Sequence, residues 1–209
     1  MKFKVTVVFI ILTSFYANAQ DFFIVKNKEF YGVVNSKGIE IAPPKYDTIA
    51  PYNQERKSWA KVNLDNKFGF IDKYGNEVVE AVYDSIGKFG MFQKKWAIIK
   101  ENGYLGFINN NGKKVINTKF DEIQAFDVYR KGWALVRIKD KSGFINNKGN
   151  TIVRIKYTEI GMFDIYKKGW AKVSVTNKLR QTKYGFIDKS GKEIIPAIYD
   201  NIDAFIKNK

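Results

Sequence analysis

Apolar and polar positions alternate over short stretches that are separated by Asx and Gly turn signals. Residues 69–79 run from a Gly-Phe-Ile stretch through the turn Asp72-Lys73-Tyr74-Gly75 into a second apolar stretch. An Asx side chain can bond the amides of its own turn, and Gly takes positive φ without a Cβ penalty. The pattern therefore predicts a hairpin with a type I turn followed by a Gly bulge. No stretch beyond residue 20 keeps a helical period, so the predicted fold class is all-β.

The same pattern returns every 37 residues. The recurring positions are Trp59, Trp96, Trp133 and Trp170; Gly32, Gly69, Gly106 and Gly143; Gly38, Gly75, Gly112 and Gly149; and Tyr46, Tyr83, Phe120 and Tyr157. A fixed step of this size is typical of stacked copies of one supersecondary unit. We expect five tandem β-hairpin repeats that start near Phe22, Trp59, Trp96, Trp133 and Trp170. Each would run through a Trp or Phe strand, a Gly-Phe-Ile strand, a turn, an apolar strand and a Tyr-Asp-x-Ile segment.

The last repeat is displaced by five residues, which gives Gly185, Gly191 and Tyr199 in the recurring positions. The extra residues fall within the polar stretch 176–183, so they predict a longer surface loop. The chain is then a signal segment at 1–19 followed by one repeat domain at 20–209.

The first nineteen residues have the features of a secretory signal peptide. Lys2 and Lys4 precede an apolar stretch, and Ala17-Asn18-Ala19 supplies the small-x-small pattern of a cleavage site. We expect cleavage between Ala19 and Gln20 and a periplasmic or extracellular location; an uncleaved anchor is the alternative. The apolar stretch is short for a bilayer, and no transmembrane segment is expected in the mature chain.

The absence of Cys and His excludes disulfides, thiol nucleophiles and imidazole metal sites. Four acids recur once per repeat: Asp47, Asp84, Asp121 and Asp200. A catalytic carboxylate pair is needed once rather than in every unit, so these acids predict hydrogen bonds at turns or strand ends. Asp127 and Asp164 recur in two units and lack the spacing of a calcium loop. We expect no cofactor, no metal and no enzyme; a hydrolase using carboxylates alone is a distant alternative.

Several recurring pieces carry a family resemblance. They are clearest in Gly132-Trp133-Ala134, in Gly169-Trp170-Ala171-Lys172-Val173 and in 184–196. These pieces resemble the WG β-repeat family, also called the KWG repeat family, over residues 22 to 206. Departures are Ser58 and Lys95 for the Gly before Trp, Phe120 for Tyr, and Thr158 for Asp. The resemblance implies a bacterial, often exported repeat protein of mostly uncharacterised role, with no catalytic residues to carry over.

Two arrangements of the repeats fit the periodicity. A closed, propeller-like ring would remove exposed strand edges, and the whole number of units favours it slightly. An open β-solenoid of stacked hairpins should have atypical end repeats. Phe22 in place of Trp and the charged tail Lys207-Asn208-Lys209 fit that expectation.

Charge is the feature that points to a partner, because the formal net charge is +15. Basic pairs precede each Trp and would align along one edge. We name this set the basic ridge: Arg56, Lys57, Lys94, Lys95, Arg130, Lys131, Lys167 and Lys168. It could attract anionic glycans, lipopolysaccharide phosphates, acidic proteins or DNA. A solvated surface that blunts strand edges is the more economical interpretation.

The repeated Trp could stack on sugar rings, but the small Ala after it favours a core layer. No dedicated nucleic-acid motif is present. The sequence thus predicts an exported, non-catalytic repeat protein that serves as a protein-binding or scaffolding module in the cell envelope. The alternative is a binder of glycan or anionic polymer through the basic ridge.

Overall fold

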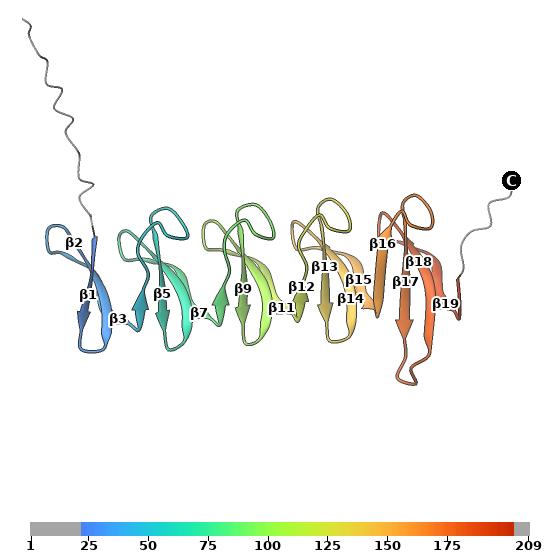
Figure 1. Ribbon diagram of the computed structural model, residues 1–209, viewed down its shortest axis with the longest axis horizontal. Helices are drawn as coiled ribbons and strands as arrows, with labels where there is room; N and C mark the ends of the chain where they lie inside the picture. Colours follow the sequence, from blue (N-terminus) through green and yellow to red (C-terminus); the bar gives the residue numbers. More distant parts are fainter. Residues whose placement is uncertain (1–21, 203–209) are drawn as a thin grey trace, which may run out of the picture.

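The computed structural model describes residues 22–202, which form 19 strands in five antiparallel sheets. The sheets follow one another in a row, each built from one stretch of the chain (Figure 1). The described residues contain no helix that could cross a membrane. The all-β prediction and the five repeats are confirmed. The predicted signal peptide at 1–19 and the charged tail at 207–209 lie outside the described residues.

The first sheet has three strands, β1 (Phe22–Asn27), β2 (Phe30–Asn35) and β3 (Glu40–Tyr46). The second has β4 (Thr48–Ile49), β5 (Trp59–Leu64), β6 (Lys67–Asp72) and β7 (Glu77–Tyr83). The third has β8 (Ser85–Ile86), β9 (Trp96–Glu101), β10 (Tyr104–Asn109) and β11 (Lys114–Phe120). The fourth has β12 (Glu122–Ile123), β13 (Trp133–Ile138), β14 (Lys141–Asn146) and β15 (Thr151–Tyr157). The fifth has β16 (Glu159–Phe163), β17 (Trp170–Thr176), β18 (Thr182–Asp188) and β19 (Glu193–Tyr199).

Sheet boundaries do not coincide with the repeat boundaries expected from the sequence. The Tyr-Asp-x-Ile segment was expected to close each unit. In the structure Tyr46 ends β3, whereas Thr48 and Ile49 pair with Asn63 and Val62 of β5. The same transfer recurs at β8, β12 and β16. Each of the first four repeats therefore contributes a short first strand to the sheet of the next repeat.

A close backbone approach explains the glycine in the middle of each second long strand. β5 and β6 pair without interruption, but the register of β6 and β7 shifts between Phe68 and Phe70. A Cβ atom on Gly69 would lie 2.5 Å from the carbonyl oxygen of Val79 and 2.7 Å from the amide nitrogen of Ala81. Only glycine lets the two backbones come this close.

The hydrophobic cores lie between successive sheets rather than within one. At the first junction, side chains of the first sheet pack against side chains of the second. The buried members are Val33, Ala42, Tyr46, Ile49, Ala60, Val62 and Ile71. Equivalent clusters fill the other three junctions. Burial of apolar surface between neighbours is the main stabilising contribution in such an array.

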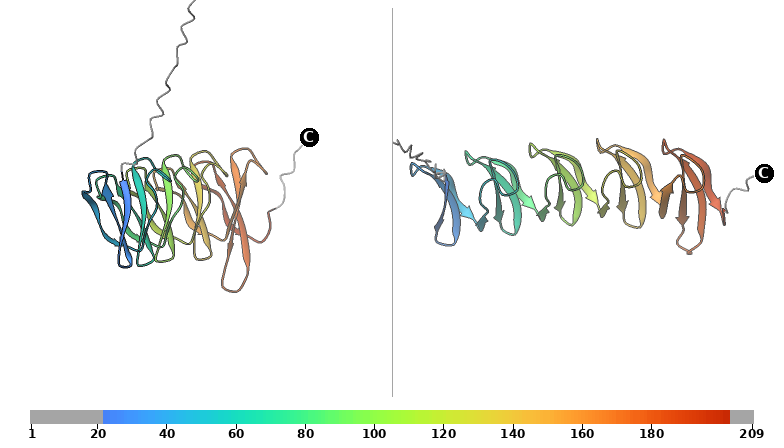
Figure 2. Two further views of the ribbon diagram at one scale, coloured as in Figure 1. Left: turned by 60° about the vertical axis from the view of Figure 1, so that its left-hand side comes forward. Right: turned by 45° about the horizontal axis from the view of Figure 1, so that its top comes forward.

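The row is open, so the ring that the whole number of units slightly favoured is not formed. The first sheet and the fifth lie at opposite ends of the row in every view (Figures 1 and 2). Phe23 and Tyr199, on the outer faces of those two sheets, are exposed. The number of units does not determine closure. The angle between neighbouring sheets does, and the repeat pattern carries no direct signal for that angle.

The five-residue displacement lengthens one hairpin, as the sequence predicts. Thr176 pairs with Thr182, one pair beyond the corresponding end of the other hairpins, and a turn at 177–181 follows. The other hairpins close with two residues, as at Asp65 and Asn66 between β5 and β6. The hairpin of β17 and β18 consequently projects below the rest of the row in Figure 1.

Candidate functional site

The row has two long edges of different composition. Loops 50–58, 87–95, 124–132 and 164–169 connect the first and second strands of sheets two to five, and the Asx turns lie at the same edge. We call this the loop edge. The opposite, hairpin edge is formed by the turns at 28–29, 65–66, 102–103, 139–140 and 177–181. The basic ridge belongs to the loop edge.

Each loop is closed by a small set of hydrogen bonds at its base. In the fourth sheet, the amide of Asp127 donates to the carbonyl of Trp133 at 3.0 Å. The Asp127 carboxylate accepts the amide of Gly132, and Asp164 accepts the amide of Gly169 in the same way. Asn53 does the equivalent for Ser58 at 2.6 Å. Asp127 and Asp164 therefore stabilise the conformation of their loops. No group of three or more acids that could hold a metal occurs within residues 22–202.

Part of the basic ridge is used in packing. The guanidinium groups of Arg56 and Arg130 lie 4.9 and 5.3 Å from the rings of Trp59 and Trp133. The Lys167 ammonium lies 4.2 Å from the Trp170 ring. Cations over indole faces are attracted by the ring quadrupole. In the second, fourth and fifth sheets the cation three positions before the Trp thus covers that indole, a role that sequence reasoning missed. The third sheet has Gln93 at this position.

The rest of the ridge faces solvent. Lys57, Lys94, Lys131 and Lys168 all stand two positions before a Trp, and all four are exposed. Within residues 22–202 their side chains take part in no hydrogen bond or ion pair. Lys95 is also exposed and has a φ of 66°. Each of these loops therefore presents at least one ammonium group that takes part in no ion pair within residues 22–202.

A second series on the loop edge was missed by sequence reasoning. Met91, Val128 and Ile165 stand three positions before the lysines, and they are 64%, 52% and 70% exposed. The first loop has Gln54 at this position. The 37-residue step contained the signal, because an apolar residue recurs there in three loops. Apolar side chains exposed in a repeated series are typical of interaction surfaces.

The repeated Trp packs against the core, as predicted, but only Trp133 is buried; Trp59, Trp96 and Trp170 are half-buried. Trp133 is buried and packs with its ring centroid 5.4 Å from Phe144 of its own sheet and 5.9 Å from Phe163 of the fifth sheet. Trp96 makes the same contacts with Phe107 and Phe126. Phe22 takes the Trp position in the first sheet and packs on Tyr52 at 4.8 Å. These indoles are packed between sheets, which leaves little of their faces for stacking on a sugar.

The repeated acids form the strand-end hydrogen bonds that their recurrence predicts. Asp47 Oδ2 accepts the amide of Asp65 at 2.7 Å, and Asp84 Oδ2 accepts the amide of Gly103 at 2.9 Å. The Lys67 ammonium and the Gly103 amide together hold the pKa of Asp84 below its usual range. Asp121 accepts an amide from the next hairpin likewise.

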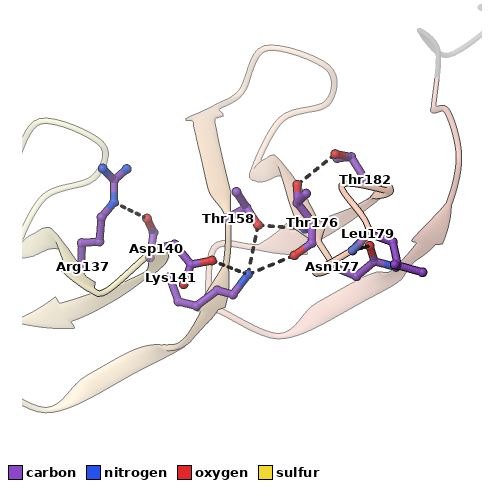
Figure 3. A network of polar contacts seen from close by, with 9 residues as sticks. Arg137, Asp140, Lys141, Thr158, Thr176, Asn177, Leu179 and Thr182 are labelled. Atoms are coloured by element: carbon purple, nitrogen blue, oxygen red, sulfur yellow. Dashed lines mark hydrogen bonds and ion pairs between the residues drawn. The ribbon is translucent and has the colours of Figure 1, made fainter.

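Thr158 replaces the acid at the last junction and keeps its role. Its Oγ1 accepts the amide of Thr176 at 2.8 Å and lies 3.3 Å from Lys141 Nζ. Lys141 also contacts the carbonyl of Thr176 at 3.2 Å and the carboxylate of Asp140 at 3.3 Å (Figure 3). This network joins the fourth sheet to the long hairpin of the fifth.

No curated protein sequence matches this chain. Among solved structures, the chain is similar to a crystal structure of the eukaryotic initiation factor, with a TM-score of 0.37 and 14% identity over 83% of this chain and 50% of that one. Hsv2 from Kluyveromyces lactis gives a TM-score of 0.29 and 10% identity over 84% of this chain and 59% of that one. The chain therefore spans less than two thirds of either structure.

The family comparison agrees with the periodicity of the sheets. The pattern of the WG containing repeat matches residues 31–68, 68–104, 106–141, 143–178 and 184–209. Five successive matches extend over most of the chain, so this chain belongs to the WG containing repeat family.

Proposed function

We propose that this chain is an exported, non-catalytic binding module of the bacterial cell envelope that holds a protein partner along its loop edge. The observation that carries the proposal is the pairing of two exposed series in successive loops. Met91, Val128 and Ile165 supply apolar surface, and a solvated lysine follows each of them three positions later.

The two series favour a partner that offers both apolar and acidic groups. Apolar surface removed from water contributes about 25 cal/mol per Å², whatever its position in the loop. Solvated lysines attract acidic side chains, accelerate association and fix the register of binding. An extended acidic segment of a protein that also carries apolar side chains meets both demands. Because the contacts recur from loop to loop, many weak interactions would add up along the row.

The non-catalytic part of the proposal rests on how the acids are used. Asp47, Asp84 and Asp121 bind the next hairpin, and Asp127 and Asp164 hold loops. The chain has no Cys and no His to supply other nucleophiles or bases. The export part rests on the sequence of residues 1–19 alone.

The test is affinity capture from envelope extracts with residues 20–209 as bait, eluted along a salt gradient. One variant replaces Met91, Val128 and Ile165 by Ser. Its matched control replaces three exposed apolar residues at the hairpin edge, Phe30, Tyr104 and Leu179, by Ser. A second variant replaces Lys57, Lys94, Lys131 and Lys168 by Gln. Its control replaces Lys28, Lys100, Lys139 and Lys178, at or next to the hairpin-edge turns, and removes the same charge.

We expect one protein that is retained by the wild-type bait and by both controls, and that is lost from both loop-edge variants. Retention of the lysine variant should weaken about tenfold or more, since it removes four exposed ion pairs that contribute roughly 0.2–1 kcal/mol each. Equal losses in the loop-edge variants and the controls would show that the loop edge is not the binding surface.

A second candidate is the binding of an anionic polymer, which the row of uncompensated lysines alone favours. In that case polysaccharide, lipopolysaccharide or DNA would be released early in the salt gradient. The lysine variant would lose it, and the Ser variant of Met91, Val128 and Ile165 would keep it. The two candidates are therefore separated by the apolar variant.

A further inference from the structure

Among residues 22–202, the first sheet has no strand at the edge where every other sheet has one. Within this range β1 pairs with β2 alone, whereas β5, β9, β13 and β17 each pair with a preceding short strand. The sequence positions that correspond to Thr48 and Ile49 are Ile11 and Leu12, inside the predicted signal peptide. The described part of the chain thus begins with a hairpin that lacks its first strand, and an unpaired edge is a template for strand addition.

The other end of the row carries the matching short segment. Asp200-Asn201-Ile202 repeats the Asp-x-Ile pattern of Asp84-Ser85-Ile86. The carbonyl of Ile202 accepts Lys172 Nζ at 3.2 Å, as the carbonyl of Ile86 accepts Lys61 Nζ at 3.0 Å.

A second contact holds the segment in the same way. Lys183 pairs with Asp200 at 2.6 Å, and Lys67 pairs with Asp84 at the corresponding place. The segment 200–202 therefore makes the same contacts with the fifth sheet as the segment 84–86, which includes β8, makes with the second sheet.

The outer face of the fifth sheet is half of a junction core. A hollow of about 440 Å³ is lined by Ile194, Ile195, Pro196, Tyr199, Asn201 and Ile202. Their counterparts at the first junction include Ile41, Ala42 and Tyr46 of the first sheet and Ile49 of β4, which pack together between the first and second sheets. Tyr46 is 1% exposed there, whereas Tyr199 is 49% exposed at the end of the row.

The outer face of the first sheet supplies the other half. Phe23, Val25 and Val34 stand at the positions of Ala60, Val62 and Ile71, which fill the first junction from the second sheet. Phe23 is larger than the Ala that occupies this position in the other four sheets, and it is 47% exposed. The hollow at the opposite end offers space for the larger ring.

We propose that copies of this chain associate head to tail, with the segment 201–202 of one copy adding to β1 of a second copy as its missing first strand. The register of β4 on β5, Thr48 with Asn63 and Ile49 with Val62, transfers to Asn201 with Lys26 and Ile202 with Val25. Strand addition supplies main-chain hydrogen bonds, and the two half-cores close on each other. A head-to-tail contact in an open row generates filaments rather than a closed dimer. The proposal is independent of the loop edge.

Disulfide trapping tests the register, since the chain has no native Cys. Two single variants of residues 20–209, Lys26→Cys and Asn201→Cys, are mixed and oxidised. Directly opposed strand residues are within disulfide reach, so we expect a covalent heterodimer. The control mixes Asn201→Cys with Lys139→Cys, an exposed hairpin-edge position. Heterodimer yield should exceed the control about tenfold, because docked cysteines react at high effective concentration.

Equal yields would overturn the proposal. A double variant carrying both cysteines should give a ladder of covalent oligomers. A disulfide-bonded monomer from the double variant would instead indicate closure of one chain on itself, and would equally overturn association with a second copy.

Sedimentation of the unmodified chain gives a second readout. The average molecular mass of the wild type should rise with protein concentration. The variants Phe23→Asp and Ile202→Asp should stay monomeric. Tyr104→Asp is the matched control, because Tyr104 is also 47% exposed but lies at the hairpin edge. It should associate like the wild type. Circular dichroism checks that all variants fold. A wild type that stays monomeric up to about 1 mM, the range of very weak association, would refute the proposal.

Discussion

A Cβ atom on Gly112 would lie 2.1 Å from the carbonyl oxygen of Val78 in the preceding repeat. The corresponding glycine of the first repeat, Gly38, has no neighbour within 4 Å of its Cβ position. The two residues have nearly the same φ, 79° and 76°. Gly112 packs against a preceding sheet and Gly38 does not. Substitutions at the two positions therefore separate the cost of backbone conformation from the cost of packing between repeats.

Gly38→Ala should lower the free energy of unfolding by about 1 kcal/mol, the cost of a left-handed conformation for a residue with a Cβ. Gly112→Ala should cost at least about 2 kcal/mol more, because the new methyl group collides with backbone that cannot move aside. Urea unfolding followed by tryptophan fluorescence measures both. Similar losses for the two variants would mean that the repeats can separate slightly without cost.

Titratable groups at the first junction should lower the free energy of unfolding at both low and high pH. Glu77 Oε1 lies 2.7 Å from Lys45 Nζ and 3.0 Å from the Tyr46 hydroxyl. The Lys45 ammonium holds the pKa of Glu77 below its usual value of 4.5, so this stabilisation is present above pH 4.5 and is lost as the pH falls. Burial and the nearby Glu77 carboxylate raise the pKa of Tyr46 above 10.0, so stability declines as the pH rises past that value.

Melting temperatures across the pH range test these two limbs. Glu77→Gln should flatten the acid side of the stability curve in part, and Tyr46→Phe should flatten the alkaline side in part. The acid side is flattened only in part because the pKa of Asp84 is also lowered, and the alkaline side only in part because burial also raises the pKa of Tyr52 to about 12. An alkaline limb that is identical in Tyr46→Phe and the wild type would contradict the assignment.

Lys95→Gly should stabilise the protein by about 1 kcal/mol. Lys95 has a φ of 66°, whereas the fourth and fifth sheets have Gly132 and Gly169 at this position. A residue with a Cβ in the left-handed region costs on the order of 1 kcal/mol. The converse change, Gly132→Ala, should destabilise by a similar amount, since its Cβ would meet nothing within 4 Å. Thermal unfolding of the two variants should therefore shift in opposite directions.

Trp133→Ala should cost about 3–5 kcal/mol, the usual loss for a large aromatic residue in a core. Trp133 packs against Phe144 of its own sheet and against Phe163 of the fifth sheet. Trp170→Ala should cost less, because Trp170 is only half-buried and belongs to the last sheet of the row. Chemical unfolding of each variant provides the comparison. A folded Trp133→Ala with unchanged stability would remove the indole from the core.

Much of the fold could be predicted from the sequence, because the repeat imposes the same local rules five times. The Asx turns appear as expected: Asn35 Oδ1 accepts the amides of Lys37 and Ile39, and Gly38 takes positive φ. The longer hairpin of the last repeat was predicted for the same reason, since a displaced register leaves few places for an insertion.

Other features depend on contacts between repeats and could not be predicted. In the sequence, Thr48 and Ile49 stand at the end of a unit, yet in the structure they belong to the next sheet. The angle between sheets, which decides between ring and row, arises from packing of whole faces. Arg56 and Lys57 are adjacent basic residues in the sequence, yet one covers an indole and the other faces water. The roles of Arg56 and Lys57 differ because their side chains point in different directions.

The transfer of a short strand at every junction determines how the row carries a mechanical load. At the first junction the chain leaves one sheet at Tyr46 and enters the next through Thr48 and Ile49, so tension along the row is applied to this short strand before it reaches the long hairpins. Each junction can then yield separately, first at its short strand and afterwards at its apolar face. A stretched row should lengthen in discrete steps, one junction at a time, and the unbroken sheets would remain able to recover the original length.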